Sequence, residues 1–293
     1  MSTLLFLTIV SSAEEARGAR LLIDSLRTFG GKLTASPFWI FAPDLEPVRA
    51  LEDERTCLLP LAAPDLVLAY PFGMKVAACA RAEELAPAGT RALVCIDTSC
   101  LIAQPPLLFD LDEDFDAALR PVHIRNVGLP ASAPLDEFWQ GIYNSVGIDD
   151  LHSTVDSFVE GQHLRAYFNS HSLTVNPGKG LFQRWYELFQ RLLANPDFQS
   201  RACADEVHQI FLFQALFSAL VATSLDLQRL RILPPTYNYP YNLQAKVPEA
   251  LRAAALNDLV CFTYEGRSLH PETVADIQVR EPLRSWLQAR IQK

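Results

Sequence analysis

Short apolar runs that alternate with helical segments constrain the fold of this chain more than any other feature of its sequence. Short continuous apolar runs are typical of parallel strands that are buried on both faces of a sheet. Strands that alternate with helices predict an α/β fold with a mixed, mostly parallel sheet flanked by helices. The four strand-like runs of the first third are Leu4–Val10, Pro37–Ala42, Thr56–Leu59 and Arg91–Ile96.

The helix expected after the first strand has signals at both ends. Ser11 or Ser12 is suited to cap its N-terminus, because a short side-chain oxygen can accept from a free backbone N–H there. Glu14 and Glu15 would complement the dipole of its first turn. Gly30 provides the stop. A second helix is predicted over Met74–Leu85.

The second half of the chain is less regular, but it shows no internal repeat, low-complexity tract or linker. A single domain over residues 1–293 is therefore expected. Strands are predicted at Pro121–Ile124, Phe168–Val175 and Leu259–Tyr264, and helices at Gly180–Leu193, Ala202–Thr223 and Pro282–Ile291.

Composition excludes several classes of protein. The 25 basic and 34 acidic residues among 293 give a net charge of −9, which argues against a nucleic-acid binder. No apolar run approaches the roughly 18–20 residues that span a bilayer, so no membrane span is expected. The six cysteines form no C-x-x-C pair, which favours buried free thiols and a cytoplasmic location.

Common enzyme motifs are absent as well. The sequence has no G-x-x-x-x-G-K-[ST], G-x-G-x-x-G, G-x-S-x-G or H-E-x-x-H. The acidic run Asp110–Asp116 starts like a calcium loop, but Phe115 stands where such a loop needs Gly. A solvated acidic loop is the simpler interpretation.

Asp97 follows the fourth predicted strand, and α/β sheets bind ligands at the carboxyl ends of their strands. The sequence Asp97-Thr98-Ser99 resembles the D-x-D region of GT-A nucleotide-diphospho-sugar transferases. In that family both aspartates hold a divalent metal ion on the diphosphate of the donor. Here Ser99 replaces the second aspartate, so the motif is degenerate.

Four more segments resemble this family in the expected order, most closely glycosyltransferase family 8, and together they cover about residues 3–265. They are Tyr70–Ala78 before the D-x-D strand, Tyr167–Val175 as the "FN(A/S)G" strand, Asp205–Gln214 as an acidic helix and Leu233–Tyr239 as the "LPxxYN" loop. The resemblance implies one GT-A-like domain. Residues 1–105 would form its nucleotide-binding half and residues 106–293 its acceptor or lid half.

The resemblance also implies roles for particular residues. The donor-binding candidates are Thr8, Ser11, Lys75, Asp97, Ser99 and His171, and the catalytic candidates are Asn169 and Asp205. Simpler structural roles stay open for several of them: Lys75 as a solvent-facing helix residue, Asn169 and His171 as satisfied polar groups, and Asp205 with His208 as an exposed first turn of a helix.

The metal site is the point where the sequence departs furthest from the family. Ser99 is a poor ligand for Mn²⁺ or Mg²⁺, and the segment Cys261–Gly266 lacks the late histidine of family 8. Three explanations follow: metal-independent transfer with Lys75 or an arginine neutralising the diphosphate, loss of catalysis, or replacement of the missing ligand by His171 beside Asp97.

The function that we expect is transfer of a sugar from a nucleotide-diphospho-sugar donor to an unknown acceptor, with retention of configuration. The alternatives are a catalytically inactive nucleotide-sugar-binding or scaffold protein and, more weakly, a nucleotidyltransferase. Exposed Tyr and Phe side chains in the second half are compatible with a homodimer.

Overall fold

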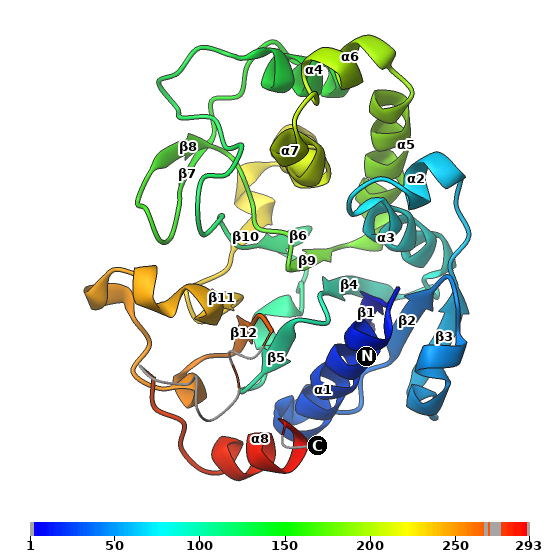
Figure 1. Ribbon diagram of the computed structural model, residues 1–293, viewed down its shortest axis with the longest axis vertical. Coiled ribbons are helices and arrows are strands. Elements are labelled where there is room, and N and C mark those ends of the chain that lie inside the picture. The colour runs from blue at the N-terminus through cyan, green and yellow to red at the C-terminus, as the bar shows by residue number, and fades with distance from the viewer. Residues whose placement is uncertain (1–2, 267–268, 270–276, 292–293) are drawn as a thin grey trace.

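A seven-stranded sheet forms the centre of the protein, in the order β10-β6-β9-β4-β1-β2-β3 (Figure 1). The computed structural model describes residues 3–266, 269 and 277–291. Strand β9 is antiparallel to both of its neighbours, and the other four pairings in the sheet are parallel. The strands are β1 (Thr3–Ile9), β2 (Phe38–Ala42), β3 (Thr56–Pro60), β4 (Thr90–Ile96), β6 (Ala117–Leu119), β9 (Ser172–Val175) and β10 (Leu230–Ile232).

Helices cover both faces of the sheet, so that side chains which alternate along a strand enter different cores (Figure 1). In β1, Leu5 and Leu7 pack in one core, while Leu4 and Phe6 pack in the other. On the first face lie α2 (Asp65–Leu68), α3 (Gly73–Leu85), α4 (Glu137–Val146), α5 (Leu181–Leu193), α6 (Pro196–Arg201) and α7 (Glu206–Ser224); on the second lies α1 (Ala13–Phe29). Helix α8 (Leu283–Ile291) packs beside α1 in a third core. The predicted α/β class with a mostly parallel sheet is confirmed.

Two smaller sheets complete the described part of the chain. Strands β11 (Tyr239–Pro240), β12 (Cys261–Thr263) and β5 (Cys100–Ile102) form one of them. Strands β7 (Thr154–Asp156) and β8 (His163–Arg165) form a hairpin. Because β5 follows Asp97 directly, its antiparallel pairing with β12 brings the late part of the chain to the end of β4.

The predicted helix cap is confirmed, but one predicted strand is wrong because a proline provides no backbone N–H for a strand ladder. Ser12 rather than Ser11 caps α1, since its hydroxyl accepts from the N–H of Glu15. The strand expected at Pro121–Ile124 is reduced to one bridge between Pro121 and Phe168. Proline has no N–H for a ladder, and the strand β6 ends before it.

The strand predicted at Phe168–Val175 begins only at Ser172. Before it, the side-chain oxygen of Asn169 accepts from the backbone N–H of His171 at 2.8 Å. Such a local side-chain bond competes with the sheet ladder and favours a turn. Asn169 and His171 therefore lie in a turn at the strand end.

The acidic run Asp110–Asp116 was expected to be a solvated loop, but its last residue, Asp116, is buried. The side chain of Asp116 is 1% exposed and lies between Arg229 and Lys179. The oxygen Oδ2 of Asp116 is 2.5 Å from Nε of Arg229 and 3.0 Å from Nζ of Lys179. Cys57 is also exposed, against the expectation of buried thiols.

Among the described residues there is one helix, α7, that is long and apolar enough to cross a membrane. Of its most apolar 18-residue stretch, 56% is buried inside the protein. Two of its polar side chains bond to the chain around the "FN(A/S)G"-like segment. The hydroxyl of Ser170 donates to Gln214, and the hydroxyl of Ser218 accepts from the N–H of Phe168. Because α7 is largely buried and its polar side chains bond to the surrounding chain, it is a core helix in this structure.

Candidate functional site

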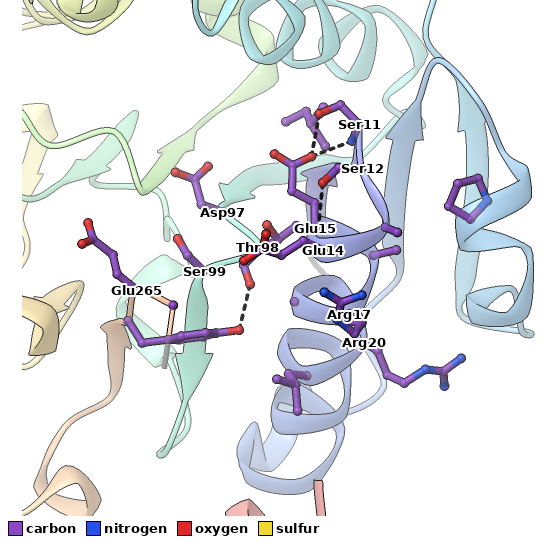
Figure 2. A pocket seen from close by; sticks show the side chains of 18 of the residues that line it. Ser11, Ser12, Glu14, Glu15, Arg17, Arg20, Asp97, Thr98, Ser99 and Glu265 are labelled. Carbon is purple, nitrogen blue, oxygen red and sulfur yellow. Dashed lines mark hydrogen bonds between the residues drawn. The ribbon is translucent and has the colours of Figure 1, made fainter. Parts of the chain in front are cut away.

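A cleft of about 1540 Å³ opens where β1 and β4 end and α1 begins. Much of its lining comes from the first turns of α1, the loop of residues 97–99, and the segment 264–266 with α8 (Figure 2). Lys75, at the start of α3, and His171 also line it. Ligands of α/β proteins bind at the carboxyl ends of parallel strands, beside helix N-termini. The cleft therefore occupies the position in which a ligand is expected.

The first turns of α1 are organised as one wall of this cleft. The N–H and hydroxyl of Ser11 both donate to the carboxylate of Glu15, at 2.6 and 2.8 Å (Figure 2). Two turns of helix later, Gly18 faces the loop after β4 so closely that a Cβ there would lie 2.5 Å from the carbonyl oxygen of Thr98. A side chain of any size at residue 18 would push α1 away from that loop.

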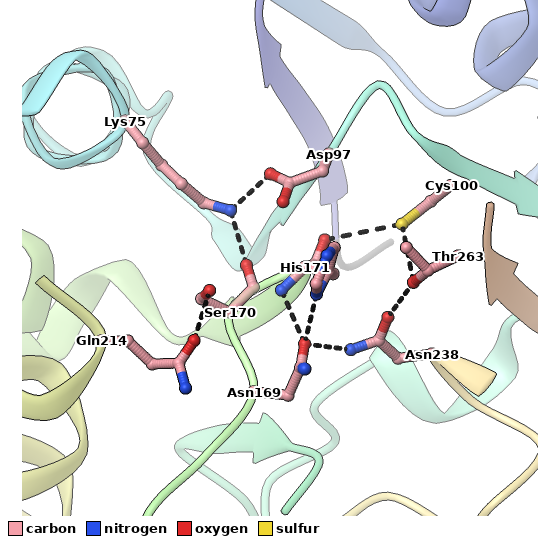
Figure 3. Close-up of polar contacts among 9 residues, drawn as sticks. All are labelled: Lys75, Asp97, Cys100, Asn169, Ser170, His171, Gln214, Asn238 and Thr263. Atoms are coloured by element: carbon pink, nitrogen blue, oxygen red, sulfur yellow. Dashed lines mark hydrogen bonds and ion pairs between the residues drawn. The ribbon is translucent and has the colours of Figure 1, made fainter. Parts of the chain in front are cut away.

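Lys75 and Asp97 form an ion pair at the inner end of the cleft (Figure 3). The ammonium group also donates to the carbonyl of Ser170 at 2.5 Å. The side chain of Lys75 is 5% exposed and that of Asp97 is 23% exposed. Burial alone would lower the pKa of Lys75, but the charge and hydrogen bond of Asp97, together with weaker neighbours, raise it above its usual value, so the lysine is charged.

A second network joins Asn169, His171, Asn238 and Thr263 (Figure 3). The oxygen of Asn169 accepts from the backbone N–H of His171, from the ring nitrogen Nδ1 at 2.9 Å, and from the amide of Asn238. The amide oxygen of Asn238 accepts in turn from the hydroxyl of Thr263 at 2.8 Å. Asn238 has a positive φ of 49°, which Asn tolerates better than most residues.

His171 connects the two networks. Its carbonyl accepts from the N–H of Asp97 at 2.9 Å, and its side chain lines the cleft. Burial lowers the pKa of His171, and Asp97 only partly opposes this effect. The imidazole is therefore neutral near pH 7. With Nδ1 engaged by Asn169, Nε2 is the ring nitrogen left to bind a ligand.

A comparison with models of protein families shows the family to which the chain belongs. The family model of the Rhodobacterales glycosyltransferase domain matches residues 6–216, which include the α1 wall of the cleft, the Lys75–Asp97 pair, Asn169 and His171, but not Asn238 or Thr263. The chain belongs to this glycosyltransferase family. A search of curated proteins found no match. Membership in the family implies a sugar donor and an acceptor.

The residues around Asp97 of this glycosyltransferase do not fit a divalent cation. The Asp97 carboxylate already pairs with Lys75, and Ser99 adds only a neutral hydroxyl. Mg²⁺ and similar ions require several oxygen ligands, with carboxylates among them. No three His, Cys, Asp or Glu side chains of the described residues are grouped to hold a metal ion.

The structure brings together most, but not all, of the residues singled out from the sequence. Ser11, Lys75, Asp97, Ser99 and His171 line the glycosyltransferase cleft. Asn169 does not line it and lies behind His171, to which it is bonded.

Thr8 and Asp205 lie apart from the cleft. Thr8 is fully buried in β1, and its hydroxyl has no partner. Asp205 caps α7 and bonds to the N–H and the ring of its neighbour His208. Gln214, which does reach the site through Ser170, comes nine residues later, or roughly 13 Å along a helix.

Sequence reasoning missed Asn238, Thr263, Gln214 and Arg17 as site residues. Asn238 belongs to the quoted "LPxxYN"-like loop, so a signal for it was present. Gln214 ends the quoted Asp205–Gln214 segment and Thr263 lies in the quoted Cys261–Gly266 segment, but neither was singled out, because each enters the site through a contact with a distant part of the chain. Arg17 lines the cleft, is exposed, and forms no hydrogen bond or ion pair with any described residue.

Proposed function

We propose that the protein transfers a sugar from a nucleotide-diphospho-sugar bound in this cleft, without a divalent metal ion. The observation that carries the proposal is the Lys75–Asp97 ion pair beside a cleft whose helical wall bears Arg17, a cation with no ion pair among the described residues. A GT-A type of fold, with residues 1–105 holding the donor and residues 106–293 the acceptor, is part of the same proposal.

The donor's diphosphate fits best against the first turns of α1. Helix N-termini favour anions, because their backbone N–H groups and the helix dipole are directed at the ligand. The guanidinium of Arg17 offers paired donors that match phosphate oxygens. Lys75 cannot easily take this role, because its charge is committed to Asp97 and to the Ser170 carbonyl.

The chemistry asked of these residues is stabilisation of the departing nucleoside diphosphate. Negative charge develops on the leaving phosphate as the bond to the sugar breaks, and a fixed cation nearby lowers the energy of that state. The neutral Nε2 of His171 and the hydroxyl of Ser99 are suited to bind sugar hydroxyls at the cleft side of the Asn169 network. Retention of configuration is proposed from the resemblance to family 8.

Thermal unfolding in the presence of UDP-, GDP-, TDP- and CMP-sugars, each with EDTA or with Mn²⁺, tests the proposal. A donor at 100 times its Kd stabilises the folded state by about 2.7 kcal/mol. We expect one nucleotide class to raise Tm equally with EDTA and with Mn²⁺. Arg17→Met should weaken that binding at least tenfold, or about 1.4 kcal/mol.

Arg81→Met is the matched control, because Arg81 is an exposed arginine that pairs with Glu84 outside the cleft. It should bind the donor like the wild type. A shift that requires Mn²⁺ would contradict metal independence, and no shift with any nucleotide-sugar would contradict donor binding. Binding without any hydrolysis or transfer of the sugar would instead support the inactive, nucleotide-sugar-binding alternative.

A further inference from the structure

A buried arginine and a buried histidine lie near His171, and their side chains form no hydrogen bond with any residue that the structure describes. Arg120 and His123, which we name the buried cationic pair, are each 5% exposed. The ring of His123 lies 6.4 Å from that of His171, between centroids. Since His171 lines the cleft, the buried cationic pair adjoins the site through His171.

Arg120 is unusual because its charge has no counterion. Its guanidinium stacks over the ring of Phe158, with Cζ at 4.6 Å from the centroid. Two of its nitrogens, Nε and Nη2, are sealed from solvent and make no hydrogen bond. No carboxylate in the described parts of the chain pairs with it. Burial lowers its pKa to about 10, so the group is still charged near neutral pH.

His123 repeats the pattern. Both of its ring nitrogens are sealed and unpartnered. Burial, together with His171 and Arg120, lowers its pKa well below the usual value, so the ring is neutral. A neutral imidazole carries one donor and one acceptor. Buried polar groups are normally hydrogen-bonded, and a cluster of orphaned nitrogens requires a ligand or water to satisfy it.

Backbone pairing fixes this pair beside the site. The N–H of Asn169 donates to the carbonyl of Arg120 at 2.7 Å, so the segments that follow β6 and precede β9 lie side by side here. On the other side, the N–H of Val159 donates to the carbonyl of His123 at 2.8 Å. The segment that leads out of strand β7 therefore covers the pair; the β7–β8 hairpin lies outside the main sheet in Figure 1.

We propose that Arg120 and His123 bind one oxyanion, a carboxylate or a phosphate group, on the acceptor substrate. A planar guanidinium bonds such a group through two parallel N–H donors, and the His123 N–H adds a third. Nη1 of Arg120 is not sealed like the other two nitrogens, so it offers the incoming anion its first contact.

The acceptor, rather than the donor, is assigned to this subsite because we place the donor's diphosphate at the first turns of α1, which include neither Arg120 nor His123. That assignment to the acceptor rests on the proposed function. Binding of an oxyanion by Arg120 and His123 does not, since it depends only on the two side chains.

Thermal unfolding in a series of inorganic phosphate and of acetate concentrations, with ionic strength held constant by chloride, tests the proposal. We expect one of the two anions to raise Tm saturably, which also tells phosphate from carboxylate. Arg120→Met should weaken this anion at least tenfold. Without anion, the variant should unfold at the same or a higher temperature than the wild type, because an unpaired buried charge has been replaced by an apolar side chain of similar length.

Two further variants separate this subsite from the donor cleft. Arg17→Met should keep the anion response while it loses nucleotide-sugar binding, and Arg120→Met should do the reverse. Arg81→Met, which removes the same charge from the surface, should keep both. The inference is overturned if neither anion shifts Tm, if Arg120→Met keeps the response, or if only Arg17→Met loses it. If the wild type responds to the anion as expected but binds no nucleotide-sugar, the proposed function is overturned and this subsite remains supported.

Discussion

The Lys75–Asp97 pair makes an asymmetric prediction, because its two members differ in exposure. The Lys75 side chain is 5% exposed, and that of Asp97 is 23% exposed. Replacement of Asp97 by Ala would strand a buried ammonium. Replacement of Lys75 by Met would leave a carboxylate that can still reach water. The first change should therefore cost more stability than the second.

The magnitudes follow from the two environments. Removing one partner of a buried ion pair costs about 3–5 kcal/mol, which we expect for Asp97→Ala. Losing a hydrogen bond to a charged group whose partner can rehydrate costs about 1–3 kcal/mol, which we expect for Lys75→Met. The double variant buries no unpaired charge, so its cost should also be about 1–3 kcal/mol and the two sites should be coupled by about 3–5 kcal/mol.

Urea unfolding of the wild type, both single variants and the double variant measures all three quantities in one cycle. At about 2 °C per kcal/mol for a chain of this size, Asp97→Ala should lower Tm by roughly 6–10 °C. The reasoning is refuted if Asp97→Ala is no less stable than Lys75→Met, or if the single effects simply add. Either result would mean that Lys75 is not committed to Asp97 and is free to contact the donor.

Two further predictions concern the packing around the cleft and the buried acid. Gly18→Ala would bring a Cβ within 2.5 Å of the Thr98 carbonyl oxygen. We therefore expect it to cost about 1–3 kcal/mol of stability and to weaken nucleotide-sugar binding at least tenfold in the thermal-shift assay. A variant with full stability and wild-type binding would contradict the close packing. The bond from Arg229 is the main reason that the pKa of Asp116 lies below its usual 3.8. A carboxyl group whose pKa is lower in the folded than in the unfolded state stabilises the folded protein at a pH above its unfolded-state pKa. This stabilisation is lost as the pH falls through the folded-state pKa. Asp116→Asn should therefore unfold at lower urea than the wild type at pH 7, with a gap that narrows below about pH 4; a constant gap in the pH series would count against the ion pair.

The strands and the first helix were predictable because their signals are local. Four apolar runs gave β1 to β4 within one or two residues, and Ser12 provided the cap of α1. Periodicity and capping involve residues only a few positions apart, so one window of sequence contains them. Strand Pro121–Ile124 was wrong for a local reason too, since Pro121 cannot donate to a ladder.

The position of Asp97 was predictable for the same reason, because it follows directly from the end of a strand. Its partner was not. Lys75 lies 22 residues away in sequence, and its position on a helix was equally consistent with exposure to solvent. Only the packing of α3 on the sheet directs its ammonium at Asp97 and at the carbonyl of Ser170.

What the sequence by itself determined is the order of strands and helices and the presence of polar groups where strands end. What only the tertiary structure decided is which of those groups meet. Asn238 reaches Asn169 across 69 residues, and Cys100 meets Thr263 across 163, through the β5–β12 pairing. Asp205 stays at its helix cap while Gln214 reaches the site, because burial and partner choice are set by long-range packing that no local pattern encodes.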